Sequence, residues 1–449
     1  MGNSSIGLLI DIDNVLEGAV VGGGKSRTGL YWTAYNIITR LLGEKNLDVT
    51  FITNRYTTLI YRDLCDVEPL FRGFHCISSL DLGTGDWWCA GPLTWLIMKR
   101  MRFKRQKRAS TGLRSLANFL LYLVFTGLVK FIRGLSLFSR KNLDVLAKFD
   151  IYQSMFYRIP DFILKNSAMG KYIFVHDIIP LRKNASFRDI PRGTRSNFSK
   201  IFENLASDVG FFFNSQYTKE DFLDYFPQYR ANRGLVAPLA ADRKLFYRDS
   251  GANRAETDRI LAKYGIPLEG KYILSLGSLN PRKNLSFLVD CFSEFLDAHP
   301  ELDDLFLVLS GPIGWHTKGI FHSLENNRRH QSRIVLTGYL EDSDLNTVYS
   351  RALCFVYPSL YEGFGLPLVE AMHCGLAIIA SNSTSLPEVY GDAALAIDPT
   401  DRASLLEALE KIYFDENLRH QLADRGLRRA ELFSWDRTLE VLLEEYSAR

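Results

Sequence analysis

The chain has 449 residues, too many for one ordinary hydrophobic core, so we expect two large domains of roughly 200 residues each. Its composition, 47% hydrophobic and 23% charged, is typical of a soluble globular protein and excludes a low-complexity chain. The formal net charge of +3 hides a basic stretch: Lys99 to Lys141 holds 12 Lys or Arg and no Asp or Glu, which leaves 42 basic against 51 acidic residues elsewhere. This stretch marks a surface for anionic partners.

The cysteines and the first residues indicate where the protein works. The six cysteines form no C-x-x-C pair and have no regular spacing, so neither a zinc site nor a disulfide framework is indicated. The first residues lack a basic region followed by an apolar one, and a strand-like run begins at Leu8, so we expect no signal peptide. Both observations favour the cytoplasm.

Short apolar runs alternate with helix-length amphipathic segments along the whole chain, as in α/β domains with parallel sheets. In the first half we predict strands at Leu8–Ile12, Val49–Thr53, Tyr172–Val175 and Val209–Asn214. In the second half we predict strands at Tyr272–Leu276, Leu305–Ser310, Ile334–Thr337, Cys354–Tyr357, Ala377–Ala380 and Ala394–Ile397. Two such arrays predict two doubly wound domains, with Gly234 to Arg248 as the connection between them.

Ligands bind beyond the carboxyl ends of the strands in open α/β sheets, so the loops after strands are the candidate site. The first is the glycine-rich Gly22–Gly29, followed by a helix from Leu30. Three more follow later strands: His176-Asp177, the stretch GSLNPRKN that begins at Gly277, and the stretch YEGFGLPLVEAMHCG that begins at Tyr361. Glycine-rich loops before helices suit phosphate or a closely approaching substrate.

The last of these loops holds two glutamates eight positions apart. Pro367 suits the first turn of a helix, and a helix start favours an anion such as phosphate. Glu362 would precede that anion and Glu370 would follow it, so the two carboxylates could hold hydroxyl-rich groups on either side. A nucleotide-sugar has this shape.

These segments resemble retaining glycosyltransferases of family 4, whose fold is GT-B. The resemblance covers nearly the whole chain and is most specific from Tyr272 to Tyr446, through GSLNPRKN, RIVLTGYL, the two-glutamate motif and SNSTSLPEVYGDAALAIDPTD. It implies two Rossmann-like domains facing across a cleft: an acceptor-binding domain of residues 1–238, which contains the segment 99–141, and a nucleotide-sugar-binding domain of residues 239–432. A last helix, residues 433–449, would return to the first domain.

The resemblance also implies roles for single residues. Glu370 resembles the carboxylate that holds the ribose hydroxyls, and Glu362 resembles the one that contacts the transferred sugar. Lys283 and Arg282, in the loop from Gly277, look like the diphosphate-binding cations, and His176 resembles the histidine near the donor sugar. The remaining candidates are backbone contacts to phosphate, sugar or base, at Gly29, Tyr339, Phe364, Gly365 and Leu366. Two residues differ from those common in the family: Gln153 replaces a frequent His, and Asn280 a frequent Glu.

Several simpler interpretations stay open beside these. Asp11 and Asp13 could form a D-x-D metal site, but they lie in or beside the first strand and lack an evident further ligand, so we expect a metal-independent reaction with no cofactor. We interpret His373 and Cys374 as packing residues, and His176 could be structural. An epimerase relative would lack the paired glutamates, and a phosphorylase would have a longer chain with a lysine-linked pyridoxal cofactor. A non-catalytic subunit would be expected to have lost Lys283 or a glutamate.

The expected reaction is sugar transfer with retention of configuration, from a nucleotide-sugar to a saccharide or polyprenyl-diphosphate-linked acceptor, in cell-surface polysaccharide or glycolipid synthesis. GDP-mannose is the first donor that the resemblance suggests, and a dTDP- or UDP-sugar is the alternative. The first part of the basic stretch, Lys99 to Arg108, precedes an apolar run, Leu116 to Val129, which is too short to span a bilayer. We therefore expect contact with an anionic membrane surface at the inner face of the cell membrane, and no nucleic-acid partner. The alternative is a buried helix of the first domain.

Overall fold

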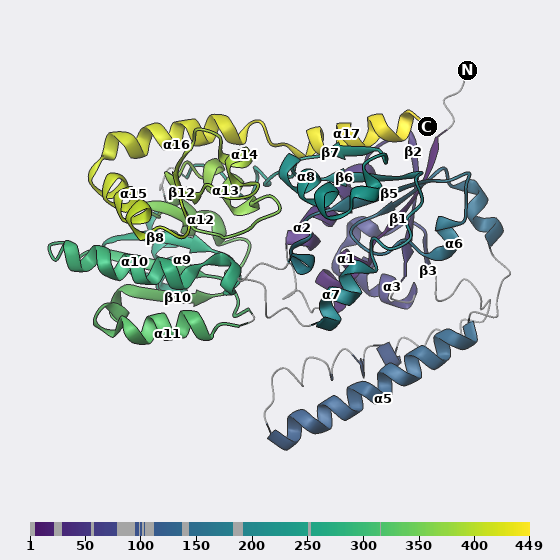
Figure 1. The fold of residues 1–449 in the computed structure, drawn as a ribbon, viewed down its shortest axis with the longest axis horizontal. Coiled ribbons are helices and arrows are strands. Elements are labelled where there is room, and N and C mark those ends of the chain that lie inside the picture. The colour runs from purple at the N-terminus through teal and green to yellow at the C-terminus, as the bar shows by residue number, and fades with distance from the viewer. Residues whose placement is uncertain are drawn as a thin grey trace.

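The computed structural model describes residues 5–21, 29–54, 58–78, 95–97, 99–100, 103, 112–136, 143–182, 192–249, 253–314 and 316–449. These residues form two sheets of parallel strands, each covered by helices, and Figure 1 shows them as two lobes side by side. The two doubly wound domains expected from the alternating pattern are therefore present.

The first sheet has seven strands in the order β3-β2-β1-β4-β5-β6-β7. Its strands are β1 Ile6–Asp11, β2 Leu47–Thr53, β3 Cys76–Ser78, β4 Ile151–Ser154, β5 Gly170–Val175, β6 Val209–Phe213 and β7 Gly234–Val236. Four were predicted with slightly different ends, but β3, β4 and β7 were missed. β7 pairs with β6, so Gly234 to Val236 belongs to the first sheet and the predicted connection began too early.

The second sheet has six strands in the order β10-β9-β8-β11-β12-β13. Its strands are β8 Lys271–Leu276, β9 Leu305–Ser310, β10 Ile334–Gly338, β11 Cys354–Tyr357, β12 Ile378–Ser381 and β13 Ala394–Ile397. All six were predicted. The chain reverses direction across the sheet between β8 and β11, so the loops after these two strands open at a topological switch point, where such sheets bind ligands.

Helices follow most strands and shield both faces of each sheet. The first lobe has α1 Asp13–Leu16, α2 Gly29–Leu41, α3 Thr58–Val67, α5 Gly112–Ser136, α6 Asp161–Leu164, α7 Arg192–Ser199 and α8 Gln216–Tyr225, with a π-helical turn Glu17–Val21 and 3-10 turns Pro69–Phe71, Leu143–Lys148, Ile179–Leu181 and Pro227–Tyr229. The second has α9 Arg254–Lys263, α10 Leu285–Ala298, α11 Lys318–Asn326, α12 Leu345–Ser350, α13 Leu366–His373, α14 Leu386–Tyr390, α15 Arg402–Phe414 and α16 Glu416–Ala430, with 3-10 turns Pro281–Lys283 and Arg328–Arg333.

The core of each lobe follows from strand geometry. Successive side chains of a strand point to opposite faces, so Tyr272 and Leu274 of β8 pack in one hydrophobic cluster while Ile273 between them packs in another. The cluster that contains Tyr272 continues into the first lobe, where it includes Leu8 and Ile10 of β1. One apolar core therefore runs through both lobes.

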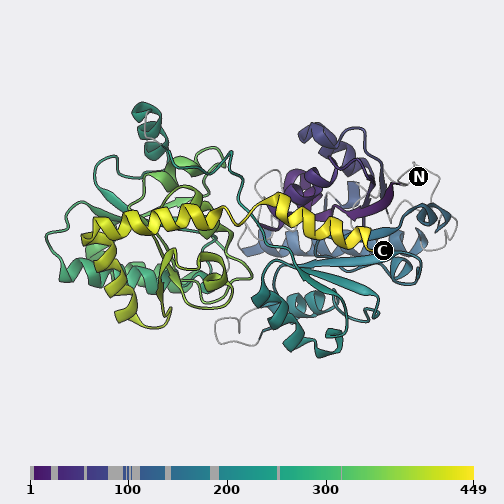
Figure 2. The same cartoon turned by 90° about the horizontal axis from the view of Figure 1, so that it is seen from above.

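The last helix, α17 (Trp435–Ser447), crosses back from the second lobe to the first, as the resemblance implied (Figures 1 and 2). Ser434 caps its start by accepting a hydrogen bond from the Arg437 amide at 3.2 Å. Near its end Tyr446 donates to the side chain of Gln153 at 2.8 Å. The residue that differs from the family's frequent histidine is thus a buried contact of α17.

Two chain segments cross between the lobes. The first follows β7, and the second joins α16 to α17. The hydroxyl of Thr438 in α17 donates a hydrogen bond to the Pro238 carbonyl oxygen, so the two crossings are bonded to each other.

Helix α5 lies apart from both sheets in Figure 1. Leu116, Leu120 and Val124 on this helix are 54% to 56% exposed, so its described side chains do not form a buried core helix. The alternative of an apolar helix inside the first domain was therefore wrong.

The docking of α17 gives a stability prediction. Leu442 is fully buried between α17 and the first lobe, so Leu442→Ala removes buried apolar surface and leaves a cavity. We expect it to lower the free energy of unfolding by about 2–5 kcal/mol. Glu444→Ala, on the exposed side of the same helix, should change it by less than about 0.5 kcal/mol. Urea unfolding followed by tryptophan fluorescence measures both, and equal effects would contradict this packing.

Candidate active site

The two-glutamate segment has the predicted loop-to-helix geometry. It follows β11 and enters α13 through Gly365, whose φ of 100° falls in the left-handed region that suits glycine. Pro367 lies in the first turn of α13, Glu362 precedes the helix and Glu370 lies on it. The start of a helix leaves backbone amides without intrahelical partners, and α13 begins in the loop after β11, at the switch point.

Glu362 is buried in an ion triad with the two predicted cations. Its carboxylate forms a salt bridge with Arg282 and accepts a hydrogen bond from Lys283 Nζ at 2.7 Å. The hydroxyl of Tyr357, at the end of β11, donates to the same carboxylate at 3.0 Å. The loops after β8 and β11 are thereby joined by charge.

The triad shifts the ionisation of its members. Burial alone would raise the pKa of Glu362, but the charges of Arg282 and Lys283 hold it at about 2. Burial lowers the pKa of Lys283 to about 8, with the Glu362 charge acting in the opposite direction. At neutral pH the set therefore carries two positive charges against one negative charge, an excess that suits a phosphate anion.

Gly277 makes room for one of these cations. Its φ is 148°, and a Cβ at this position would lie 2.8 Å from Lys283 Cε. The Lys283 side chain therefore packs against the Gly277 backbone, where a side chain would collide with it.

Glu370 faces a different space from Glu362. It lines a cavity of about 90 Å³ together with Trp32 and Tyr35 of the first lobe and Asp342 of the second. Tyr349 donates to its carboxylate at 2.8 Å. Burial raises the pKa of Glu370 to about 7, and the Asp342 charge adds to the rise against the Tyr349 hydrogen bond. A ligand that donates hydrogen bonds to this carboxylate would favour its charged form.

His176 follows β5 and is buried between aromatic rings. Its ring lies 5.1 Å from that of Phe156 and 4.9 Å from that of Phe174, measured between ring centroids. Burial lowers its pKa to about 3, so the imidazole is neutral. Its Nε2 atom has no hydrogen-bond partner within the described residues.

The first lobe holds the two-glutamate loop at its backbone. The Gly363 carbonyl oxygen accepts hydrogen bonds from Ser215 Oγ at 2.7 Å and Thr218 Oγ1 at 2.8 Å. Glu388 of α14 accepts from the backbone amides of Gln216 and Tyr217 at 2.8 and 3.1 Å, which places a carboxylate at the start of α8. The loop that bears Glu362 belongs to the second lobe and is hydrogen-bonded to the first.

The other predicted residues are more dispersed. Gly29 begins α2 and is exposed, and the predicted glycine-rich loop before it falls outside the described residues. Tyr339 follows β10, is 41% exposed and lies 3.4 Å from Asp342 through its hydroxyl. Phe364 and Leu366 flank Gly365, and the Phe364 ring packs on Phe433 at 5.6 Å rather than facing solvent.

Sequence reasoning missed several polar residues that complete the site. They are Tyr349 and Tyr357, which bond the two glutamates, and Ser215, Thr218 and Glu388, which join the lobes. The position of Tyr357 at the end of a predicted strand was a usable signal. No local pattern indicated the contacts between the lobes.

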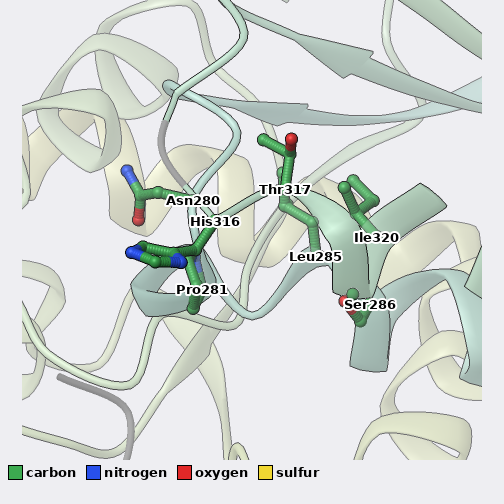
Figure 3. A pocket seen from close by; sticks show the side chains of 8 residues that line it. Asn280, Pro281, Leu285, Ser286, His316, Thr317 and Ile320 are labelled. Atoms are coloured by element: carbon green, nitrogen blue, oxygen red, sulfur yellow. The ribbon is translucent and has the colours of Figure 1, made fainter. Parts of the chain in front are cut away.

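A smaller cavity lies beside the same loop. Figure 3 shows Asn280 and the His316 ring near Pro281, with Leu285, Ser286, Thr317 and Ile320 around the remaining wall. Its volume is about 60 Å³. Asn280, which differs from the family's frequent glutamate, therefore lies in the loop of Arg282 and Lys283 but lines this cavity.

The possible metal site at Asp11 and Asp13 is a buried hydrogen-bonded corner. Asp11 accepts from the Asn54 side chain at 2.8 Å, and Asp13 accepts from the Asn54 amide at 3.2 Å. The described part of the chain contains no group of three or more His, Cys, Asp or Glu that could hold a metal ion.

The contact at Gly363 gives a prediction about domain closure. A Cβ at this position would lie 2.0 Å from the His176 carbonyl oxygen, so Gly363→Ala cannot keep the lobes together as they are. We expect small-angle scattering to show a larger radius of gyration for this variant. Gly319→Ala is the control, because its nearest neighbour would be Ser286 Oγ at 3.3 Å. An unchanged radius with Gly363→Ala in a folded protein would contradict the contact.

Comparison with known proteins agrees with this architecture. The family profile of glycosyl transferases group 1 matches residues 256–429. O-antigen chain mannosyltransferase B of Escherichia coli is 32% identical over 303 residues, which cover 66% of this chain and 74% of that protein. The serotype-specific mannosyltransferase WbdA of Escherichia coli is 32% identical over 274 residues, 61% of this chain but only 32% of that longer protein.

Among solved structures, sucrose-phosphate synthase from Thermosynechococcus elongatus superposes with a TM-score of 0.62 at 17% identity, over 99% of this chain and 98% of that one. This likeness confirms the expected GT-B fold. The family profile and the identity to O-antigen chain mannosyltransferase B confirm the expected glycosyltransferase family at the level of group 1. The chain belongs to the glycosyl transferases group 1 and is a glycosyltransferase.

Proposed function

We propose that the protein transfers mannose from GDP-mannose, with retention of configuration, to a saccharide or lipid-linked saccharide in cell-surface polysaccharide synthesis. The observation that carries the reaction is the buried set of Arg282, Lys283 and Glu362 at the switch point. The choice of sugar is supported by the two Escherichia coli mannosyltransferases at 32% identity. A dTDP- or UDP-sugar donor is the alternative outcome of the test below.

The chemical problem is the departure of a nucleoside diphosphate. When the bond between the sugar C1 and the phosphate oxygen breaks, negative charge grows on that oxygen and the sugar becomes oxocarbenium-like. Arg282, Lys283 and the free amides at the start of α13 supply positive charge for the departing group. The residues that would hold the diphosphate therefore also stabilise the transition state.

Retention does not need a nucleophile from the protein in this proposal. The acceptor oxygen attacks C1 on the face that the phosphate leaves, and its proton passes to the departing phosphate oxygen. Neutral His176 would lie beside the sugar and offer a hydrogen-bonding nitrogen without competing for that proton. Glu362 would hold sugar hydroxyls, and its low pKa keeps it an acceptor of hydrogen bonds.

The nucleoside half would use the larger cavity, which Glu370 lines. Glu370 would accept hydrogen bonds from the ribose hydroxyls, and the backbone at Tyr339, which follows β10, would meet the base. Gly29 and the amides of Phe364, Gly365 and Leu366 would contact phosphate or sugar. The first lobe would hold a saccharide or polyprenyl-diphosphate-linked acceptor, and the reaction would then take place at the inner face of the cell membrane.

We expect turnover to be independent of a metal ion, because Arg282 and Lys283 neutralise the diphosphate. Release of GDP from GDP-mannose should rise on addition of a saccharide acceptor and persist unchanged in EDTA. Parallel assays with UDP- and dTDP-sugars test the donor. Loss of release in EDTA with recovery in Mg²⁺ or Mn²⁺ contradicts metal independence. A folded protein that releases no nucleoside diphosphate from any donor is a non-catalytic subunit instead.

Substitution of the two glutamates should affect GDP affinity and turnover differently. Glu370→Ala should weaken binding of free GDP about 10- to 100-fold, since it removes a charged hydrogen-bond acceptor from the ribose. Glu362→Ala should lower turnover but leave GDP affinity unchanged or higher, because it releases Arg282 and Lys283 from their ion pair.

Isothermal titration with GDP and steady-state turnover measure both effects, and Glu325→Ala on the exposed face of α11 is the surface control. Equal losses of GDP affinity in the two variants would refute the assignment of Glu362 to the sugar.

A further inference from the structure

Helix α5 has an exposed face made entirely of apolar residues and glycine. The exposed positions between residues 116 and 128 are Leu116, Ala117, Leu120, Leu121, Leu123, Val124, Gly127 and Leu128. At about 100° per residue they cover one continuous arc of about 160°. Several large side chains there are 40% to 56% exposed, so this face has no cover within the described residues.

Between residues 115 and 128, the polar residues of α5 lie on the opposite side of the helix. Ser115, Asn118, Tyr122 and Thr126 fall in the remaining arc and are less exposed. Phe125, in the same arc, stacks on Phe103 at 5.5 Å and meets Trp95 edge-on at 5.7 Å. A surface helix of a water-soluble domain has the reverse arrangement, with polar side chains outward. The exposed apolar arc of α5 therefore suits an apolar surrounding better than water.

Charge indicates which medium. Lys99 lies 5.5 Å above the Trp95 ring, and Arg100 is its neighbour in the same short helical segment. Both belong to the stretch Lys99 to Lys141, whose 12 basic residues are accompanied by no acidic residue. A second copy of this chain packed on α5 would bring the two basic stretches close to each other, whereas anionic lipid would bring opposite charges.

We propose that α5 lies on an anionic lipid surface, with the apolar arc in the boundary between headgroups and acyl chains and the neighbouring cations at the lipid phosphates. Aromatic and basic residues beside such an arc suit the headgroup level. The described residues contain no helix long and apolar enough to cross a membrane. The proposal deepens the proposed function, on which it rests only for the acceptor, since lipid-linked acceptors lie at the same surface.

Vesicle co-sedimentation tests the apolar arc. The full-length protein should sediment with vesicles of phosphatidylglycerol and phosphatidylethanolamine, and more weakly with neutral phosphatidylcholine. The triple variant Leu120→Glu, Leu123→Glu, Val124→Glu should bind anionic vesicles at least tenfold more weakly. The matched control is Val67→Glu, Leu70→Glu, Leu268→Glu, which adds the same charge at residues of 46% to 51% exposure elsewhere, and it should bind as the unchanged protein does.

The cations form the second arm. Changing all Lys and Arg of the stretch Lys99 to Arg108 to Gln should weaken binding to anionic vesicles and remove most of its salt dependence. Donor hydrolysis in solution should stay unchanged in every variant, so failure of docking and failure of the proposed reaction are separable.

Several outcomes would overturn the proposal. They are absence of sedimentation by the unchanged protein, equal losses in the α5 and control variants, and retention of the protein on vesicles after alkaline carbonate extraction, which indicates a spanning segment. A dimer that the α5 triple variant converts to a monomer in the absence of lipid would assign the face to a second copy.

Discussion

The burial of three charges at one switch point constrains the rest of the active site. Arg282 and Lys283 end the loop after β8, and Glu362 sits in the loop after β11, so a single ion set joins two strands that are neighbours only in space. Two buried cations with one carboxylate leave a positive excess in a poorly solvated place, and a bound anion is the natural compensation. In the proposed reaction this positive excess would favour the diphosphate of the donor.

The loop that carries Glu362 is also a contact between the lobes. Its Gly363 carbonyl is held by hydroxyls of Ser215 and Thr218, and its Tyr361 hydroxyl donates to Asp221 on α8. Position and charge of Glu362 are thus set from both sides: the second lobe supplies its cations and the first fixes its backbone. The charged set itself lies within the second lobe, and the first lobe contacts the residues on either side of Glu362.

Regular elements were predictable from the sequence where the pattern was long and apolar. All six strands of the second sheet were found this way, because buried parallel strands read as continuous apolar runs. β3 and β7 were missed because three residues give no periodic signal, and β4 because Gln153 and Ser154 interrupt its apolar run. The positions of both glutamates on a loop and a helix followed from local turn chemistry.

Partners in space were not predictable from the same signals. Nothing local to Lys283 indicates that it pairs with Glu362, which lies 79 residues away, and nothing local to Glu388 indicates that it caps a helix of the other lobe. Such contacts depend on how two sheets face each other. The exposure of α5 was likewise not predictable, because the sequence of an apolar helix does not show whether the helix packs in a core or lies at a surface.

The double crossing of the chain limits how the lobes can move. A single crossing would let the lobes rotate relative to each other about several axes. Two crossings that are bonded to each other through Thr438 and Pro238 restrict this rotation to fewer axes. The lobes would then regain the same relative orientation each time they close, with the hydroxyls of Ser215 and Thr218 in position to bond Gly363.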